Sequence, residues 1–260
     1  MIGVFDSGVG GMTVARAIEQ VLPEYRLVYF GDLARTPYGS KSPQAICRYS
    51  LENSEFLLKK GARIIVIACN SAASVATEEI RRHFPVPVFE VITPAVDAAV
   101  NGSISGRIGV IGTRATVGSG IYEQLIRARR GDAAVFSQPC PLLVPLVEEG
   151  WLQRRETKMI LRRYLAPLRD HQVDTLVLGC THYPILKELI RRRVGKKTAI
   201  VDSSAAVARA IRSHLDADPA LAATLQRDGE NCYYVSDVTP AASQIASMIF
   251  GRSVPLQKVD

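Results

Sequence analysis

The stretch Val66-Ile67-Ala68-Cys69-Asn70-Ser71 decides the fold class of this chain, together with a second stretch of the same pattern, Val177-Leu178-Gly179-Cys180-Thr181-His182. In both, an apolar run rich in β-branched residues ends at a cysteine, and a polar residue follows that can cap a helix. Open α/β sheets place their chemistry at such strand-to-helix junctions. A thiol at a helix N-terminus is expected to have a lowered pKa and to keep a thiolate fraction.

The regions around these two stretches also match each other, which indicates an internal repeat. Ile108-Gly109-Val110-Ile111-Gly112-Thr113 matches Ile2-Gly3-Val4-Phe5-Asp6-Ser7, with nearly the same spacing along the chain as the two cysteines. Strand and helix patterns alternate through both halves. The sequence therefore predicts an α/β fold of two related halves, each with a thiol at the same place. Two such thiols could face one substrate from opposite sides, as inversion of a stereocentre requires.

The boundary between the halves is expected near the small, polar break Asn101 to Gly106. We predict a first α/β domain over residues 1–95 and about 205–260, and a second over residues 96–204. The strand and helix patterns at the C-terminus are predicted to return to the first domain. A helix pattern of the second domain is expected to stop near Pro167, because proline lacks the backbone N–H that a helix interior uses.

Two loops at strand ends carry further candidate site residues. Asp6-Ser7-Gly8-Val9-Gly10-Gly11 follows the first strand pattern, but its glycine order fits neither nucleotide-binding fingerprint, and a carboxylate would repel phosphate. We therefore interpret Asp6 and Ser7 as site residues, with turn capping as the alternative. Pro37-Tyr38-Gly39 follows the next strand pattern. Tyr38 could cover a ligand or pack on the surface, and the spacing does not choose between these.

The composition narrows the class of protein. The net charge is +7, but the basic residues are mostly dispersed along helix patterns, so no nucleic-acid partner is expected. The five cysteines include no Cys-x-x-Cys pair, and we expect neither a disulfide framework nor a metal site. No apolar run approaches the roughly 20 residues of a membrane span. The N-terminus enters a strand pattern without the features of a signal peptide, so we expect a cytoplasmic protein.

Five separated motifs determine which family the chain resembles. The chain is similar, over nearly its whole length, to the glutamate racemases of the cofactor-independent aspartate/glutamate racemase superfamily. The resemblance rests on Phe5-Asp6-Ser7-Gly8-Val9-Gly10-Gly11, Tyr29-Phe30-Gly31-Asp32 with Pro37-Tyr38-Gly39, Ala68-Cys69-Asn70, Pro145-Leu146-Val147-Glu148-Glu149-Gly150 and Leu178-Gly179-Cys180-Thr181-His182-Tyr183-Pro184.

The resemblance implies two Rossmann-like α/β domains related by pseudo-twofold symmetry, with the active site in the cleft between them. It also implies interconversion of L- and D-glutamate without a cofactor, which supplies D-glutamate for bacterial peptidoglycan. Cys69 would remove the α-proton of D-glutamate, and Cys180 that of L-glutamate. A free thiol has a pKa of roughly 8.5, so near neutral pH it can act as a base and as an acid.

The same motifs imply the residues around the substrate. Asp6 would assist the first cysteine, and His182 with a nearby glutamate would assist the second. That glutamate is either Glu148 or Glu149, and we favour Glu149. The family usually has a threonine where this chain has Ser71, so the hydroxyl is kept and a methyl group is missing. The residues expected to line the substrate are Asp6, Ser7, Pro37, Tyr38, Gly39, Asn70, Ser71, Thr113, Thr181 and His182.

Other functions stay open from the residues alone. A cysteine hydrolase or transferase would use Cys180 with His182, form a covalent intermediate and not need Cys69. A two-domain ligand-binding protein would tolerate the loss of both thiols. A racemase for aspartate or another small acidic amino acid is the alternative within the family, although the Asp-Ser-Gly-Val-Gly-Gly start favours glutamate. We expect a homodimer that uses no cofactor.

Overall fold

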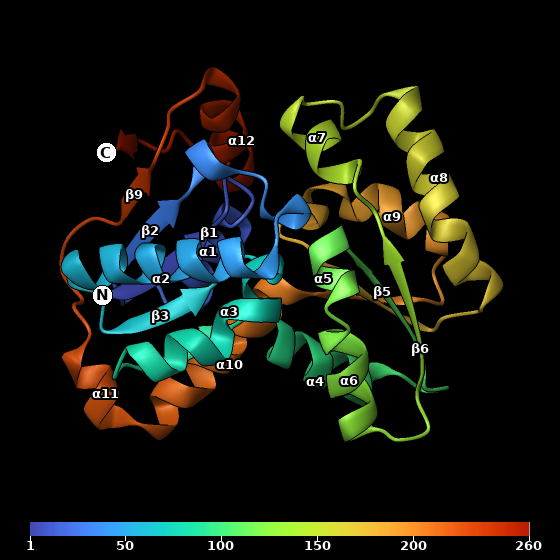
Figure 1. The fold of residues 1–260 in the computed structure, drawn as a ribbon, viewed down its shortest axis with the longest axis horizontal. Coiled ribbons are helices and arrows are strands. Elements are labelled where there is room, and N and C mark those ends of the chain that lie inside the picture. The colour runs from blue at the N-terminus through green and yellow to red at the C-terminus, as the bar shows by residue number, and fades with distance from the viewer. Residues whose placement is uncertain (260) are drawn as a thin grey trace.

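Two parallel β-sheets form the centre of the molecule and lie side by side in Figure 1. The computed structural model describes residues 1–259. Within that range the first sheet has six strands in the order β10-β9-β2-β1-β3-β4, and the second has four in the order β6-β5-β7-β8. The strands are β1 (Ile2–Asp6), β2 (Leu27–Gly31), β3 (Ile64–Ile67), β4 (Val88–Glu90), β5 (Arg107–Gly112), β6 (Ala134–Pro139), β7 (Thr175–Gly179), β8 (Ala199–Asp202), β9 (Cys232–Val235) and β10 (Leu256–Lys258).

Helices cover the sheets and connect their strands (Figure 1). They pack through apolar stripes, such as Leu161, Leu165 and Leu168 of α8, which repeat at helical spacing. Within residues 1–259, none of them has both the length and the apolar composition that a bilayer crossing requires. The helices are α1 (Met12–Val21), α2 (Pro43–Lys59), α3 (Asn70–His83), α4 (Ile92–Gly102), α5 (Arg114–Gly118), α6 (Ile121–Arg129), α7 (Leu143–Glu148), α8 (Arg155–Asp170), α9 (Lys187–Val194), α10 (Ser203–Ala217), α11 (Pro219–Thr224) and α12 (Pro240–Phe250).

The two sheets repeat one topology. The order β2-β1-β3-β4 in the first sheet corresponds to β6-β5-β7-β8 in the second, and β1 and β5 hold the two matching sequence segments. Cys69 follows β3 and Cys180 follows β7, so each thiol lies beyond the carboxyl end of the equivalent strand. The predicted α/β class, with two related Rossmann-like halves, is confirmed. The boundaries at residues 95/96 and 204/205 stay a prediction.

The C-terminal part of the chain returns to the first sheet, as expected. β9 pairs with β2 and β10 pairs with β9, so both strands extend that sheet at one edge. α10 leads back from the second sheet and packs against α1. The guanidinium of Arg212 on α10 donates two hydrogen bonds, of 2.6 and 2.9 Å, to the carboxylate of Glu24 beyond α1. The C-terminal part of the chain is therefore held to the first half by strand pairing and by this ion pair.

The predicted end of a helix near Pro167 is wrong. α8 continues through Pro167 and ends at Asp170. Proline removes one backbone hydrogen bond, but Leu165 and Leu168 on either side of it are each only 2% exposed. Burial of these two leucines holds the last turn in helical geometry, because a buried leucine side chain contributes about 1.5–3 kcal/mol.

Asp174, the residue before β7, holds the loop between α4 and β5. Its carboxylate accepts hydrogen bonds from the Ser103 hydroxyl at 2.7 Å, the Ser105 backbone N–H at 2.6 Å and the Ser105 hydroxyl at 2.8 Å. Partial burial raises the pKa of Asp174, but these donors outweigh it and lower the pKa to about 2.

We expect Asp174→Asn to lower the free energy of unfolding by about 1 kcal/mol at pH 7, a figure kept small because the group is largely solvated. The folded-state pKa of about 2 lies below the ordinary value of 3.8. The carboxylate therefore stabilises the fold above that ordinary value, and this stabilisation is lost as the pH falls through the folded-state pKa. Urea denaturation of both proteins should show a difference that shrinks over this interval. A difference independent of pH would contradict the prediction.

Candidate active site

Cys69 is the N-cap of α3 and lies against the turn after β1. Its Sγ is 3.6 Å from the Ser7 hydroxyl, and the residue is 5% exposed. Burial raises the pKa of Cys69, the negative charge of Asp6 adds to this, and the result is a pKa of about 12. The expectation of a lowered pKa is therefore wrong for this thiol. The helix N-terminus does lower the pKa through the backbone N–H of Ala72, but desolvation is the larger effect.

Cys180 has a different partner, although it lies at the equivalent place in the second half. It is also 5% exposed, and its Sγ is 3.9 Å from Nδ1 of His182. The segment after it forms a short 3₁₀ helix, Tyr183–Leu186, before α9 begins. The predicted α-helical N-terminus at this cysteine is therefore wrong, and a histidine ring supplies the nearest polar contact instead.

His182 links Cys180 to an acidic side chain. Its Nε2 is 3.2 Å from the Glu148 carboxylate, and the histidine is 3% exposed. Burial lowers the pKa of His182, but the hydrogen bonds with Cys180 and Glu148 outweigh burial and raise the pKa to about 10. The ring is therefore an imidazolium at neutral pH, with Nδ1 donating towards the sulfur and Nε2 donating to the carboxylate. The structure therefore places a cation 3.9 Å from the sulfur of Cys180.

The prediction that Glu149 is the acidic partner of His182 is wrong, because Glu148 makes this contact. α7 ends at Glu148, and Glu149 is its exposed C-cap. Adjacent residues at a helix end point about 100° apart, so only one of the two can reach the histidine.

Asp6 connects the two halves of the site. The residue is fully buried at the end of β1, where its carboxylate accepts a 3.0 Å hydrogen bond from the Gly8 backbone N–H. It also accepts a 3.2 Å hydrogen bond from the hydroxyl of Thr181, the residue after Cys180. Burial raises the pKa of Asp6, and the charge of His182 together with these donors opposes the rise. Asp6 therefore contacts the end of the second sheet as well as the region of Cys69.

The glycines of the first motif allow this close approach. A Cβ atom added at Gly10 would lie 2.4 Å from Nδ1 of His182, and one added at Gly11 would lie 2.2 Å from Cβ of Asp6. Both distances are impossible for real side chains. The motif therefore serves to bring backbone against site side chains, which agrees with our interpretation that it is not a phosphate loop.

Hydroxyl groups from both halves meet beside Cys69. The Ser71 Oγ is 2.9 Å from the Thr113 Oγ1, and the Thr113 Oγ1 is 3.1 Å from the Thr116 Oγ1. A Cβ atom added at Gly39 would lie 2.6 Å from Cβ of Thr113, so the loop that contains Gly39 packs against this group. The structure therefore brings together Gly39, Ser71 and Thr113, as predicted. Thr116 was not predicted to be a site residue. In the sequence it looks like an ordinary residue of a first helical turn, whose backbone N–H the Thr113 side chain caps.

Asn70, at the start of α3, has an unused hydrogen-bond donor. The residue is 2% exposed, and within residues 1–259 its Nδ2 has no hydrogen-bond partner. A buried amide N–H₂ without an acceptor costs free energy, so such a group is a candidate to bind an acceptor from a ligand. This observation agrees with the predicted role of Asn70 in binding substrate.

The side chain of Tyr38 does not line the site. Its ring is fully buried, its hydroxyl donates to the carboxylate of Asp32, and the hydroxyl accepts a 3.1 Å hydrogen bond from Asn53. Both sequence-based options for this tyrosine, ligand cover and surface packing, are therefore wrong. Pro37, the residue before it, is exposed on the turn. Tyr38 acts as an interior anchor, and the backbone at Gly39 is the part of this loop that reaches Thr113.

A cavity of about 220 Å³ lies between the two halves at this edge. Its lining includes Gly8, Val9 and Thr36 from the first half and Glu148 from the second. The cavity therefore adjoins both the turn after Asp6 and Glu148, the acidic partner of His182. Within residues 1–259, no three His, Cys, Asp or Glu side chains are grouped so that they could hold a metal ion.

Comparison with known proteins agrees with this geometry. The model of the Asp/Glu/Hydantoin racemase family matches residues 11–211. A glutamate racemase from Persephonella marina is 42% identical over 260 residues, which covers 100% of this chain and 96% of that protein. Two crystal structures are similar to this chain: glutamate racemase isoform RacE1 from Bacillus anthracis, with a TM-score of 0.93, and glutamate racemase from Francisella tularensis in complex with D-glutamate, with a TM-score of 0.91. Each is 32% identical in sequence, and each match covers 100% of this chain and 97% of the other chain. This chain therefore belongs to the Asp/Glu/Hydantoin racemase family.

Proposed function

We propose that this protein is a glutamate racemase in which Cys69 and Cys180 exchange the α-proton of glutamate from opposite faces. One observation carries the proposal: two buried thiols follow equivalent strands, β3 and β7, of two related halves. The Thr181–Asp6 hydrogen bond joins the end of β7 to the end of β1, the strand that pairs with β3. The identity with glutamate racemases over the full chain supports glutamate as the substrate. The D-glutamate produced would enter peptidoglycan synthesis.

The two thiols have neighbours of opposite charge, His182 beside Cys180 and Asp6 near Cys69. The α-proton of an amino acid is weakly acidic, so a base must face it while an acid waits on the other side. The imidazolium of His182 lies beside the sulfur of Cys180, whereas the pKa of about 12 keeps Cys69 protonated. This pair is set to remove the proton of L-glutamate at Cys180 and to deliver one from Cys69. In the reverse reaction Cys69 would be the base and Cys180 the acid.

The polar groups around the thiols match the charges of glutamate. The carboxylate of Asp6 can accept from the substrate ammonium group, together with the hydroxyl of Ser7. The free Nδ2 of Asn70 and the hydroxyls of Ser71 and Thr113 can donate to a carboxylate. Because these groups are buried, their electrostatic interactions with a bound substrate are stronger than in water.

That the protein forms a homodimer and that it lies in the cytoplasm both stay predictions from the sequence. A nucleic-acid partner is not part of the proposal, because the basic residues are mostly dispersed along helix patterns. Size-exclusion chromatography with light scattering measures the oligomeric state directly.

We expect Cys69→Ser and Cys180→Ser each to lower racemisation of L- and D-glutamate by at least about 100-fold, because a serine hydroxyl is a far weaker acid than a thiol. Circular dichroism of the amino acid in D₂O, without added cofactor, measures inversion, and NMR measures deuterium at the α-carbon. Cys232→Ser is the matched control. Cys232 is a half-buried cysteine on β9 in the first sheet, so this variant should keep wild-type activity.

The same variants separate the proposal from its alternatives. A cysteine hydrolase would depend on Cys180 alone, and a racemase for aspartate would invert aspartate faster than glutamate. A ligand-binding protein would incorporate no deuterium into glutamate even with both cysteines in place. Any of these results would overturn the proposal.

We expect Glu148→Gln to shift the alkaline limb of the pH–rate profile to lower pH. The carboxylate of Glu148 helps to raise the pKa of His182 to about 10, so its removal lets the imidazolium lose its proton at a lower pH. The profile of kcat/KM for L-glutamate between about pH 6 and 11 measures this shift. Glu149→Gln, one residue along, is the matched control. Equal shifts in both variants would show that Glu148 has no specific role.

A further inference from the structure

The orientation of the Asn70 amide is set by one hydrogen bond. Its Oδ1 accepts a 2.7 Å hydrogen bond from the hydroxyl of Tyr122, and its Nδ2 has no partner within residues 1–259. A side-chain amide can rotate and exchange its donor end with its acceptor end. The tyrosine therefore decides which end of Asn70 is free.

Tyr122 reaches Asn70 from the other half of the molecule. It is the second residue of α6, which connects β5 and β6 of the second sheet, whereas Asn70 begins α3 beside the first sheet. The tyrosine is 2% exposed, and a Cβ atom added at Gly179 would lie 3.3 Å from Cε2 of its ring. Gly179 directly precedes Cys180, so the ring packs against the strand that carries the second thiol.

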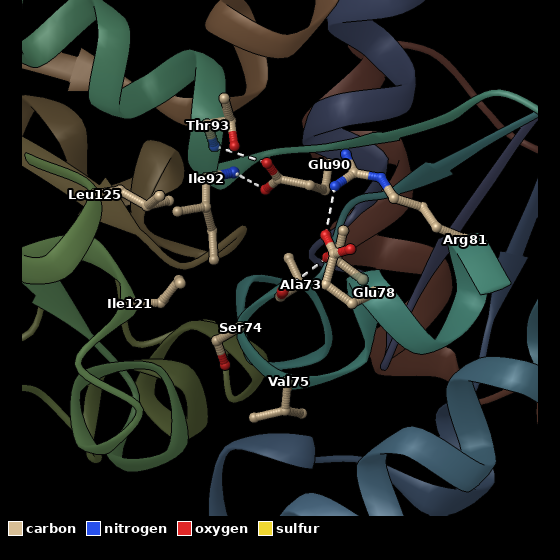
Figure 2. A pocket seen from close by; sticks show the side chains of 11 residues that line it. Ala73, Ser74, Val75, Glu78, Arg81, Glu90, Ile92, Thr93, Ile121 and Leu125 are labelled. Carbon is tan, nitrogen blue, oxygen red and sulfur yellow. Dashed lines mark hydrogen bonds and ion pairs between the residues drawn. The ribbon is translucent and has the colours of Figure 1, made fainter. Parts of the chain in front are cut away.

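Elsewhere along α3 and α6 the two helices are separated by a cavity. Figure 2 shows Ile121 and Leu125 of α6 on one wall of a cavity, with Ala73 and Ser74 of α3 on another. The cavity has a volume of about 220 Å³. Within residues 1–259, the Tyr122 hydroxyl is the hydrogen-bond partner of the Asn70 side chain, and this bond links α3 to α6.

The hydroxyl of Tyr122 acts as the donor in this bond. Burial raises the pKa of Tyr122 well above 10, and the charges of Glu90 and Cys180 raise it further. The phenol therefore keeps its proton at neutral pH. A neutral phenol in contact with Oδ1 leaves the N–H₂ group of Asn70 facing away from α6.

We propose that Tyr122 is a positioning residue for substrate binding, which holds the Asn70 amide so that Nδ2 donates to a carboxylate of glutamate. This inference rests on the proposed function. Tyr122 acts through Asn70 and touches no reacting atom. Because the bond crosses between the halves, Asn70 has its binding orientation only when the halves are together.

The test is Tyr122→Phe, which removes one oxygen atom and keeps the ring. A free amide populates both orientations and loses a well-placed hydrogen bond to the substrate, so KM for both enantiomers should rise about five- to tenfold. The bond is made equally in the ground state and the transition state, so kcat should stay within about twofold. Tyr233→Phe is the matched control, since Tyr233 is also 2% exposed and its hydroxyl binds Glu19, at the side of the first sheet. It should leave KM unchanged.

A double-mutant cycle with Asn70→Ala separates positioning from a general structural role. If Tyr122 acts through Asn70, Tyr122→Phe should have no further effect on KM in the Asn70→Ala protein. Additive effects would overturn the inference, as would a Tyr122→Phe protein with wild-type KM. Inactive wild-type protein would instead overturn the proposed function.

A binding measurement makes the test independent of turnover and folding. In the Cys180→Ser background, calorimetry should show the dissociation constant of D-glutamate raised by the same factor when Tyr122→Phe is added. Thermal unfolding of each variant should stay close to that of its parent, because the ring packing is kept. An unchanged dissociation constant in a folded protein would contradict the inference.

Discussion

The site depends on one buried interaction, the hydrogen bond from the Thr181 hydroxyl to the carboxylate of Asp6. A fully buried carboxylate is costly unless donors surround it, and here the donors come from the turn after β1 and from the end of β7. This requirement holds the strand ends of the two sheets together. Gly10 and Gly11 make the approach possible, because any side chain at either position would overlap His182 or Asp6.

The two halves have the same topology but opposite electrostatics. The carboxylate of Asp6 disfavours ionisation of Cys69, whereas the imidazolium of His182 lies beside the sulfur of Cys180. Two-base chemistry needs this inequality, because two thiolates or two thiols could not transfer a proton across a substrate. Glu148 adds to this difference, because its carboxylate helps to raise the pKa of His182. A repeated fold thus supplies the positions of the sulfur atoms, and non-equivalent neighbours supply their roles.

The repeat, the α/β class, the cysteine positions and the return of the C-terminus to the first sheet could all be predicted from the sequence. Apolar runs that end at a cysteine are local features, and burial of such runs leaves few alternatives to parallel strands. Predictions that depended on contacts with distant parts of the chain failed more often. Tyr38 points into the interior and not towards a ligand, Glu148 replaces Glu149, and α8 continues through Pro167.

By itself, therefore, the sequence determined the fold class, the two thiols and most of the polar groups around them, because these follow from periodicity and from residue type at strand ends. Only the tertiary structure decided which neighbours each thiol has, that burial makes Cys69 a weak acid, and that Tyr122 orients Asn70. The physical reason is that a pKa or an amide orientation is set by groups from distant segments. Desolvation and hydrogen bonding depend on distances that no local pattern contains.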